Sequence, residues 1–515
     1  MLRVFQADLL NPDHFTVTLE LIPGREATGR SVENVMGIAR DAYADGRVSA
    51  VSMTDNPGGN PALSPDVLGN EIFKLGMDVI VHFTCRDTNR VGMESRALQL
   101  AMMGMKNILA LTGDYSGRGF GGQGAPVFDI DSVQLQILLG MLNERLEANG
   151  DPDPFFTGCA VSPFKTTEAE SFAQYAKMCR KAAAGAKFII TQLGYDASKF
   201  AELMRIRSYM GLDLPVLGSV YVLTPRAARV MNSGKVPGVT VSDRLLRRVE
   251  DEWRQADQGR KAAVERAARL AAILKGLRYK GVHIGGIHRS FDMVGRILDR
   301  MSDYEDQWEE LVPEMNFSTP GGYDAYPSHA SKPAFGDGVL ELKTIDRIHY
   351  GVLSGSHDLF FNRESLLGKF FSYFCHLCDG TWAEKAILEI VEDPIKRMML
   401  KCQRCGDCGI QHVGFLCPES GCPKHMRNGA CGGSRGGKCE VYEDRDCIWV
   451  KAYRRLAHSG LSRSIVNGCV PPRMWELNQT SSWFNFHLRR DHQHVSSAIA
   501  DRCGMVECRL MKPKD

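Results

Sequence analysis

Eight short runs of β-branched and other apolar residues alternate with longer segments of helical periodicity over the first 300 residues of this 515-residue chain. A polar or glycine-containing break follows each run. The runs are Val17–Ile22, Ala50–Met53, Val79–Thr84, Ile108–Thr112, Phe155–Val161, Phe188–Thr191, Val216–Val222 and Gly281–Ile284. The helical segments include Ser31–Ala44, Met93–Met105, Ser132–Ala148, Glu168–Ala184, Ala197–Met210, Pro225–Ser233 and Arg260–Leu277. This alternation predicts a parallel sheet with crossover helices.

The number of units selects the fold. Eight β/α units that close on themselves form a (β/α)8 TIM barrel, which we predict, and an open doubly wound sheet is the alternative. A chain of 515 residues exceeds one ordinary domain. We therefore expect the barrel over residues 1–310, a connecting segment rich in Pro and Gly over 311–345, and a smaller Cys-rich metal-binding domain over 346–515.

Charge and hydropathy exclude several classes of protein. The chain has 63 basic and 61 acidic side chains and a formal charge of +2, which gives no electrostatic reason to expect a nucleic acid partner. It contains no run of 18 apolar residues, so we expect no membrane span. The start MLRVFQADLL lacks the apolar region of a signal peptide. We expect a cytoplasmic protein that forms a homo-oligomer.

Polar residues follow the predicted strands. Because the loops after the strands build the active face of a TIM barrel, these side chains are candidate site residues. They are Glu20, Thr54, Asp55, His82, Thr84, Gly113, Asp114, Lys165 and Gln192. Carboxylates, amides and hydroxyls around one mouth suit a polar heterocycle. A carboxylate such as Glu20 can also simply pair with a nearby arginine, and only the joint position of the set favours a functional site.

Eight cysteines lie within 46 residues near the carboxyl end, and they divide evenly into two sets of four. They are Cys402, Cys405, Cys408, Cys417, Cys422, Cys431, Cys439 and Cys447. The first three have the spacing C-x2-C-x2-C, and Pro418 and Pro423 each follow a cysteine. Glycines around Cys431 allow backbone N–H groups to turn toward anionic sulfur.

The cysteine spacing favours iron–sulfur clusters, with zinc as the main alternative. A zinc ribbon usually has two separated C-x2-C pairs, whereas a C-x2-C-x2-C run with a remote Cys-Pro is typical of iron–sulfur ligands. Disulfides suit small secreted chains and fit this one poorly. Cys375-x2-Cys378 lies just upstream, and its sequence suits a packed helix as well as a ligand pair.

Motifs at the strand ends resemble those of the methylenetetrahydrofolate reductase family, in the same order along the whole predicted barrel. They are LELIPG, VSMTDNPGGN, HFTCRD, LALTGD, AGAKFIITQ and GVHIGG. The Cys-rich end is similar to the C-terminal domain or subunit that accompanies such reductases in some bacteria. Its motifs are CQRCGDCG, GACGG, GKCEV and CIWVKAYRRL.

The resemblance implies roles for individual residues. Glu20 corresponds to the general acid that assists opening of the five-membered ring of methylenetetrahydrofolate, before hydride transfer from the flavin. Asp114 corresponds to an aspartate near flavin and pterin, and Gln192 to an amide that binds the pterin edge. The positions that match flavin contacts are Thr54, His82, Thr112, Gly113, Asp114 and Lys181.

The chain departs from the family pattern on the flavin side. Asp55 stands where an aromatic residue often follows the threonine, and residues 161–165 read VSPFK where an aromatic residue and a histidine are common. The flavin can therefore be FAD or FMN. No dinucleotide-binding G-x-G-x-x-G occurs in a βαβ setting, and residues 117–121 predict a flexible loop.

Three functional hypotheses follow. The first is a flavin-dependent oxidoreductase that interconverts 5,10-methylenetetrahydrofolate and 5-methyltetrahydrofolate, with a metal domain for electron transfer or structure and a ferredoxin-like carrier or NAD(P)H as electron partner. The second is methyltetrahydrofolate oxidation in a demethylation pathway. The third is a non-catalytic folate-binding scaffold with structural zinc.

Overall fold

The barrel prediction is confirmed. In a computed structural model, which describes residues 4–151, 153–327, 330–336, 342–461, 465, 468–495, 499 and 502, eight parallel strands close in the order β1-β10-β9-β8-β7-β4-β3-β2. The strands are β1 (Thr16–Leu21), β2 (Ala50–Met53), β3 (Val79–Thr84), β4 (Asn107–Leu111), β7 (Phe156–Val161), β8 (Phe188–Thr191), β9 (Val216–Tyr221) and β10 (Gly281–Gly285). Each lies within one residue of its predicted limits. The closed order excludes the open doubly wound sheet.

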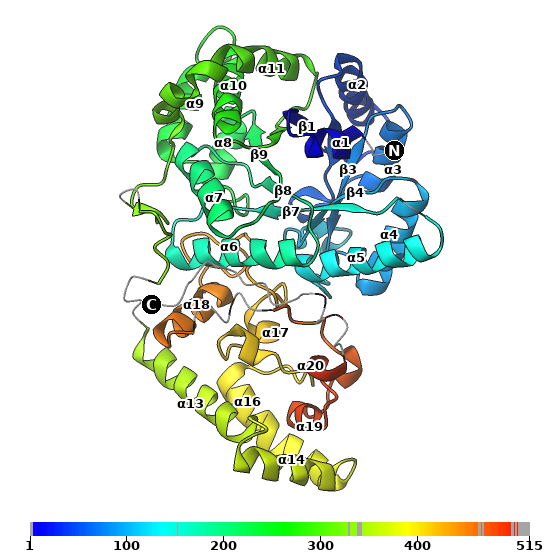
Figure 1. Cartoon of the computed structure of the whole chain (residues 1–515), viewed down its shortest axis with the longest axis vertical. Coiled ribbons are helices and arrows are strands. Elements are labelled where there is room, and N and C mark those ends of the chain that lie inside the picture. The colour runs from blue at the N-terminus through cyan, green and yellow to red at the C-terminus, as the bar shows by residue number, and fades with distance from the viewer. Residues whose placement is uncertain are drawn as a thin grey trace.

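Helices surround the strands (Figure 1). They are α2 (Arg30–Asp45), α3 (Pro65–Phe73), α4 (Arg90–Met102), α5 (Ser132–Ala148), α6 (Glu168–Ala183), α7 (Ala197–Tyr209), α8 (Pro225–Asn232), α9 (Asp243–Trp253), α10 (Arg260–Gly276) and α11 (Asp292–Tyr304). Asp131 starts α5 with a capping box, in which its side chain accepts from the N–H groups of Val133 and Gln134. Within the expected flexible loop after β4, a small hairpin forms from β5 (Arg118–Gly119) and β6 (Gly122–Gln123).

The barrel interior is apolar at the amino ends of the strands and polar toward their carboxyl ends. The unpredicted helix α1 (Val4–Leu10) closes the amino end, where Phe5 packs edge-on against Phe188 with ring centroids 5.3 Å apart. Leu9 joins the same apolar cluster. On β1, alternation sends Val17, Leu19 and Leu21 toward the helices. Thr18 and Glu20 therefore face the interior.

The carboxyl-terminal region is helical and rich in cysteine. Its helices are α13 (Thr344–Phe360), α14 (Leu366–Cys378), α15 (Trp382–Ile387), α16 (Asp393–Leu400), α17 (Pro418–Gly421), α18 (Ile448–His458), α19 (Ser482–His487) and α20 (His492–Val495). Figure 1 shows α5 and α6 between the barrel strands and this region. Tyr453 on α18 stacks on Phe172 of α6 at 4.6 Å and donates to Glu168 at 2.6 Å.

The expected connecting segment spans residues 311–345, of which 328–329 and 337–341 lie outside the described residues, and its described part packs on the barrel. The N–H of Tyr323 donates to the carbonyl of Thr166 at 3.0 Å, and the N–H of Ala325 donates to Glu202 at 3.0 Å. The domain limits themselves stay a prediction. Among the helices that the structure describes, none is both long enough and apolar enough to cross a membrane.

Candidate functional site

Glu20 lies inside the barrel near the carboxyl end of β1. A Cβ atom on Gly285 of β10 would be 2.7 Å from Glu20 Oε2, so the carboxylate occupies the space that this glycine leaves. In the described part of the chain, Glu20 forms no hydrogen bond and no ion pair, which rules out simple pairing with an arginine there. Burial raises the pKa of Glu20 to about 7. Burial, and to a smaller extent the charge of Glu20, raises the pKa of Tyr221 to about 12.

A polar layer that includes two histidines lies inside the barrel. His283 Nδ1 is 2.8 Å from Thr18 Oγ1, and its Nε2 is 3.4 Å from Ser52 Oγ. Burial lowers the pKa of His283 to about 3 and, with help from Arg96, that of His82 to about 4. Both imidazoles are therefore neutral at physiological pH, as a buried site without a counter-charge requires.

Two of the expected flavin contacts have unused polar atoms. Thr54 Oγ1 and His82 Nε2 are buried and have no hydrogen-bond partner among the described residues. Buried polar groups are nearly always satisfied, so such atoms mark a place where a bound molecule completes the bonding. A heteroatom-rich ring such as a flavin fits this requirement.

Asp114 lies on the loop after β4, and its geometry depends on Gly113. Gly113 has a φ of +91°, and a Cβ atom there would lie 3.0 Å from Thr84 Cβ, so glycine is required. Asp114 Oδ2 accepts from the N–H of Gly58 at 3.1 Å. Burial raises the pKa of Asp114, and Lys424 of the carboxyl-terminal region opposes that shift.

Gln192 follows β8. Its Oε1 accepts from the N–H of Leu193 at 2.9 Å, and a Cβ atom on Gly238 would lie 3.3 Å from its Nε2. No described group accepts a hydrogen bond from that Nε2. The amide therefore keeps donors for a ligand, consistent with the expected pterin contact.

Two expected flavin contacts point elsewhere. The Thr112 hydroxyl is 3.2 Å from Ser132 Oγ at the start of α5. Lys181 reaches from α6 to the carbonyl of Ala160 on β7 at 2.6 Å, and burial lowers its pKa to about 8. Both side chains thus contact the layer between strands and helices, in contrast to the inward-facing Thr54 and His82.

The residues that depart from the family pattern have other contacts. Asp55 binds Arg96 at 2.8 Å and accepts from the Thr84 hydroxyl at 2.9 Å. Lys165 Nζ donates to the carbonyls of Gly432 at 2.5 Å and Ser434 at 2.6 Å. The loop after β7 therefore holds the carboxyl-terminal region.

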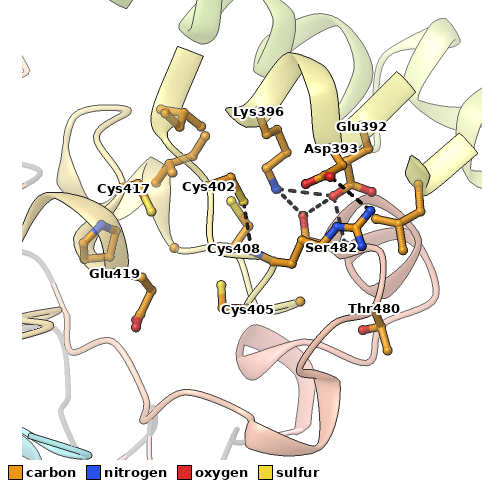
Figure 2. A pocket seen from close by; sticks show the side chains of 17 residues that line it. Glu392, Asp393, Lys396, Cys402, Cys405, Cys408, Cys417, Glu419, Thr480 and Ser482 are labelled. Atoms are coloured by element: carbon orange, nitrogen blue, oxygen red, sulfur yellow. Dashed lines mark hydrogen bonds and ion pairs between the residues drawn. The ribbon is translucent and has the colours of Figure 1, made fainter. Parts of the chain in front are cut away.

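Four cysteines line a small hollow in the carboxyl-terminal region (Figure 2). This first thiol set consists of Cys402, Cys405, Cys408 and Cys417. Lys396 lies beside it, paired with Glu392 at 3.3 Å. The N–H of Arg404 points at Cys402 Sγ at 3.4 Å.

The other four cysteines line a separate small hollow. This second thiol set consists of Cys422, Cys431, Cys439 and Cys447. Burial raises the pKa of Cys422 to about 12, and the backbone N–H groups of Met426 and Lys424 oppose that shift. The N–H of Gly433 acts in the same way on Cys431. The amides therefore point toward sulfur, as the glycine-rich sequence predicts.

All eight of these cysteines are free thiols. Cys375 and Cys378 lie on α14 and line neither hollow. Within the described ranges, no group of three or more His, Cys, Asp or Glu side chains is arranged to hold a single metal ion.

A buried ion pair joins the second thiol set to the barrel. Lys424 Nζ donates to the carbonyl of Gly113 at 2.8 Å and pairs with Glu440, whose Oε1 is 3.3 Å from Cys431 Sγ. Sequence reasoning missed Lys424, Glu440, Tyr221 and His283 as site residues. Only Tyr221 and His283 had a usable signal, because they lie on predicted strands.

Two family models match parts of the chain. A family model described as methylenetetrahydrofolate reductase matches residues 6–301. The chain belongs to the methylenetetrahydrofolate reductase family. A second model, described as methylene-tetrahydrofolate reductase C terminal, matches residues 383–476. Membership of the family implies a flavin.

Two relatives are methylenetetrahydrofolate reductases from eukaryotes. The probable NADPH enzyme of Caenorhabditis elegans is 23% identical over 309 residues, which cover 58% of this chain and 44% of that protein. Methylenetetrahydrofolate reductase 1 of Schizosaccharomyces pombe is 26% identical over 220 residues, which cover 41% of this chain and 34% of that protein. The chain thus spans less than half the length of either relative.

A solved structure also resembles the chain. It is an uncharacterized protein from Clostridium thermocellum, described as binding two copies of 5-methyl-5,6,7,8-tetrahydrofolic acid. It is 11% identical, covers 59% of this chain and 99% of its own, and has a TM-score of 0.41.

Proposed function

We propose that this protein is a flavin-dependent oxidoreductase that interconverts 5,10-methylenetetrahydrofolate and 5-methyltetrahydrofolate. The observation that carries the proposal is Glu20, an unpaired carboxyl inside the barrel whose pKa burial raises to about 7. A general acid works best when its pKa lies near the operating pH. About half of these carboxyls carry a proton at pH 7, and the protonated form can give that proton to a folate nitrogen as the five-membered ring opens.

Other residues of the chain orient the reactants. Gln192 has an amide donor available for the pterin edge, and Asp114, on the loop after β4, would act through its charge on both bound rings. Thr54 and His82 would hold the flavin, FAD or FMN, through their unused polar atoms. When bound, the flavin supplies the hydride chemistry, and the protein supplies orientation and the proton.

The two thiol sets would each hold an iron–sulfur cluster. Within the described residues, no group of three or more His, Cys, Asp or Glu side chains is arranged to hold a single metal ion such as zinc. Four thiols that line one hollow, with backbone N–H groups pointing at sulfur, match the four-cysteine ligand set of an iron–sulfur cluster. The second thiol set lies next to the Gly113–Asp114 loop, so it is the one placed to exchange electrons with the flavin.

Anaerobic purification of the full chain tests the proposal. Flavin extraction distinguishes FAD from FMN, while iron, sulfide and zinc assays identify the metal. Initial rates with each folate, and with NAD(P)H or reduced ferredoxin, then identify the direction and the electron partner. A folded chain without flavin and without turnover would overturn the proposal, whereas zinc in both thiol sets would overturn only the electron route.

A further inference from the structure

Two buried lysines of the barrel point their ammonium groups at the loop that carries Cys431. Lys165 and Lys177 are each 3% exposed. Lys165 Nζ donates to the carbonyls of Gly432 and Ser434. Lys177 Nζ donates to the carbonyl of Gly429 at 3.2 Å. Neither forms an ion pair with any described carboxylate.

A third buried cation approaches the same cysteine. Lys424, 2% exposed, pairs with Glu440 beside Cys431. Lys424 and Lys177 both act electrostatically on Cys431, and Lys165 is attracted by Cys431 and Cys447 as well as by Glu170 and Glu440. Positive charge therefore converges on the second thiol set from the barrel and from its own domain.

Burying an ammonium group without an anionic partner is unfavourable, because carbonyl oxygens replace only part of its hydration. Among the described residues, Lys165 and Lys177 make their direct oxygen contacts with carbonyl groups alone. A metal centre bound by four thiolates carries net negative charge, and it would add to the attraction that Glu170 and Glu440 exert on Lys165 from beyond contact distance. The barrel lysines are thus explained if the second thiol set is anionic.

The first thiol set has a different electrostatic environment. Its buried lysine, Lys396, is paired with Glu392 at 3.3 Å, and Arg404 is paired with Asp393 at 3.0 Å. Each of these cations is therefore balanced by a carboxylate. Reduction adds one negative charge to a cluster, and uncompensated positive charge nearby favours that reduced state.

We propose that Lys165 and Lys177 are positioning charges that raise the reduction potential of the centre in the second thiol set above that of the centre in the first. This inference rests on the proposed iron–sulfur occupancy. One electron leaves the first centre, which is oxidised, and enters the second, which is reduced, with no proton transferred. Electrons would then collect next to the Gly113–Asp114 loop.

The test is a redox titration of the full-length, anaerobically purified protein, followed by electron paramagnetic resonance and with iron content measured in parallel. Lys165→Met and Lys177→Met remove charge while keeping most of the side-chain volume, and Lys165→Arg keeps the charge. Lys451→Met, at a half-buried site on α18 where the ammonium group lies 3.8 Å from Asp346, is the control. A Cys402→Ser chain, altered in the first set, assigns the remaining signal to the second.

We expect each Met variant to make one-electron reduction of the second centre about tenfold less favourable, a fall of about 59 mV. In the Met variants, the reduction potential of the first centre should stay near its wild-type value. In Lys165→Arg and Lys451→Met, the potentials of both centres should stay near wild type. Unchanged potentials in both Met variants, with iron retained, would overturn the inference and leave the proposed function standing. Loss of iron from both Lys165→Met and Lys165→Arg would indicate that Lys165 supports the site through packing and not through its charge. That result would also overturn the inference. Absence of iron from the wild-type second set would overturn the electron route and the inference together.

Discussion

Lys424 Nζ lies 2.8 Å from the carbonyl oxygen of Gly113, although the two residues are 311 positions apart in the chain. The contact joins a residue two positions after Cys422 to the residue directly before Asp114. Since Lys424 also pairs with the buried Glu440, one side chain connects the candidate redox centre with the candidate flavin site.

Lys424→Met should destabilise the folded protein by about 3–5 kcal/mol, because it leaves Glu440 buried without its cation. Chemical denaturation of the purified chain measures this change. Adding Glu440→Gln should recover part of the loss, whereas Lys451→Met should change the free energy of unfolding by less than about 0.5 kcal/mol. A loss of under about 1 kcal/mol in Lys424→Met would show that the pair contributes little.

Glu20→Gln should lower turnover of the folate by at least about 100-fold, because it removes the proton donor while keeping shape and polarity. Folate binding, measured by calorimetry, should remain largely intact. Glu33→Gln, at an exposed position on α2, is the matched control and should retain full activity. Undiminished turnover in Glu20→Gln would refute the acid role.

The rate of methylenetetrahydrofolate reduction should depend on pH through Glu20. A general acid must be protonated, and the pKa of this carboxyl is about 7, so kcat/KM should be high below pH 7 and fall as the pH rises through that value. A pH profile of kcat/KM measures the fall. A profile that is flat between pH 6 and 8 would contradict the assignment.

Gly285→Ala should reduce turnover by about tenfold or more while the barrel stays folded. The new Cβ would lie 2.7 Å from Glu20 Oε2 and 3.2 Å from Tyr221 Cδ2, so the carboxylate must move, and small displacements of a reacting group are costly. Gly140→Ala on α5, where no neighbouring atom lies within 4 Å, is the control. Equal activity in the two variants would mean that the position of Glu20 is not critical.

The sequence predicted the barrel well because each strand is a β-branched run ended by glycine or polar residues, a local signal. It gave no hint of α1, whose seven residues are too few for a clear helical period and whose Phe5 finds its partners far along the chain. Glu20, Thr54 and His82 were found as candidates because they stand at the ends of predicted strands.

The rest of the site depends on long-range packing. Thr112 and Lys181 were assigned to the flavin by resemblance alone, and their contacts are with Ser132 and Ala160. Lys424 and Glu440 became candidates only when the carboxyl-terminal region was placed against the barrel. No periodicity within either segment encodes that contact.

Helix α1 seals the amino end of the barrel with Phe5 and Leu9. A molecule that reaches Glu20 would therefore enter and leave at the opposite end, where Gly238 lies close both to the carbonyl of Gly432 in the Cys431 loop and to Gln192. Folate and electrons would then reach the site from the same end of the barrel. A large electron-transfer partner bound at that end would compete with folate exchange.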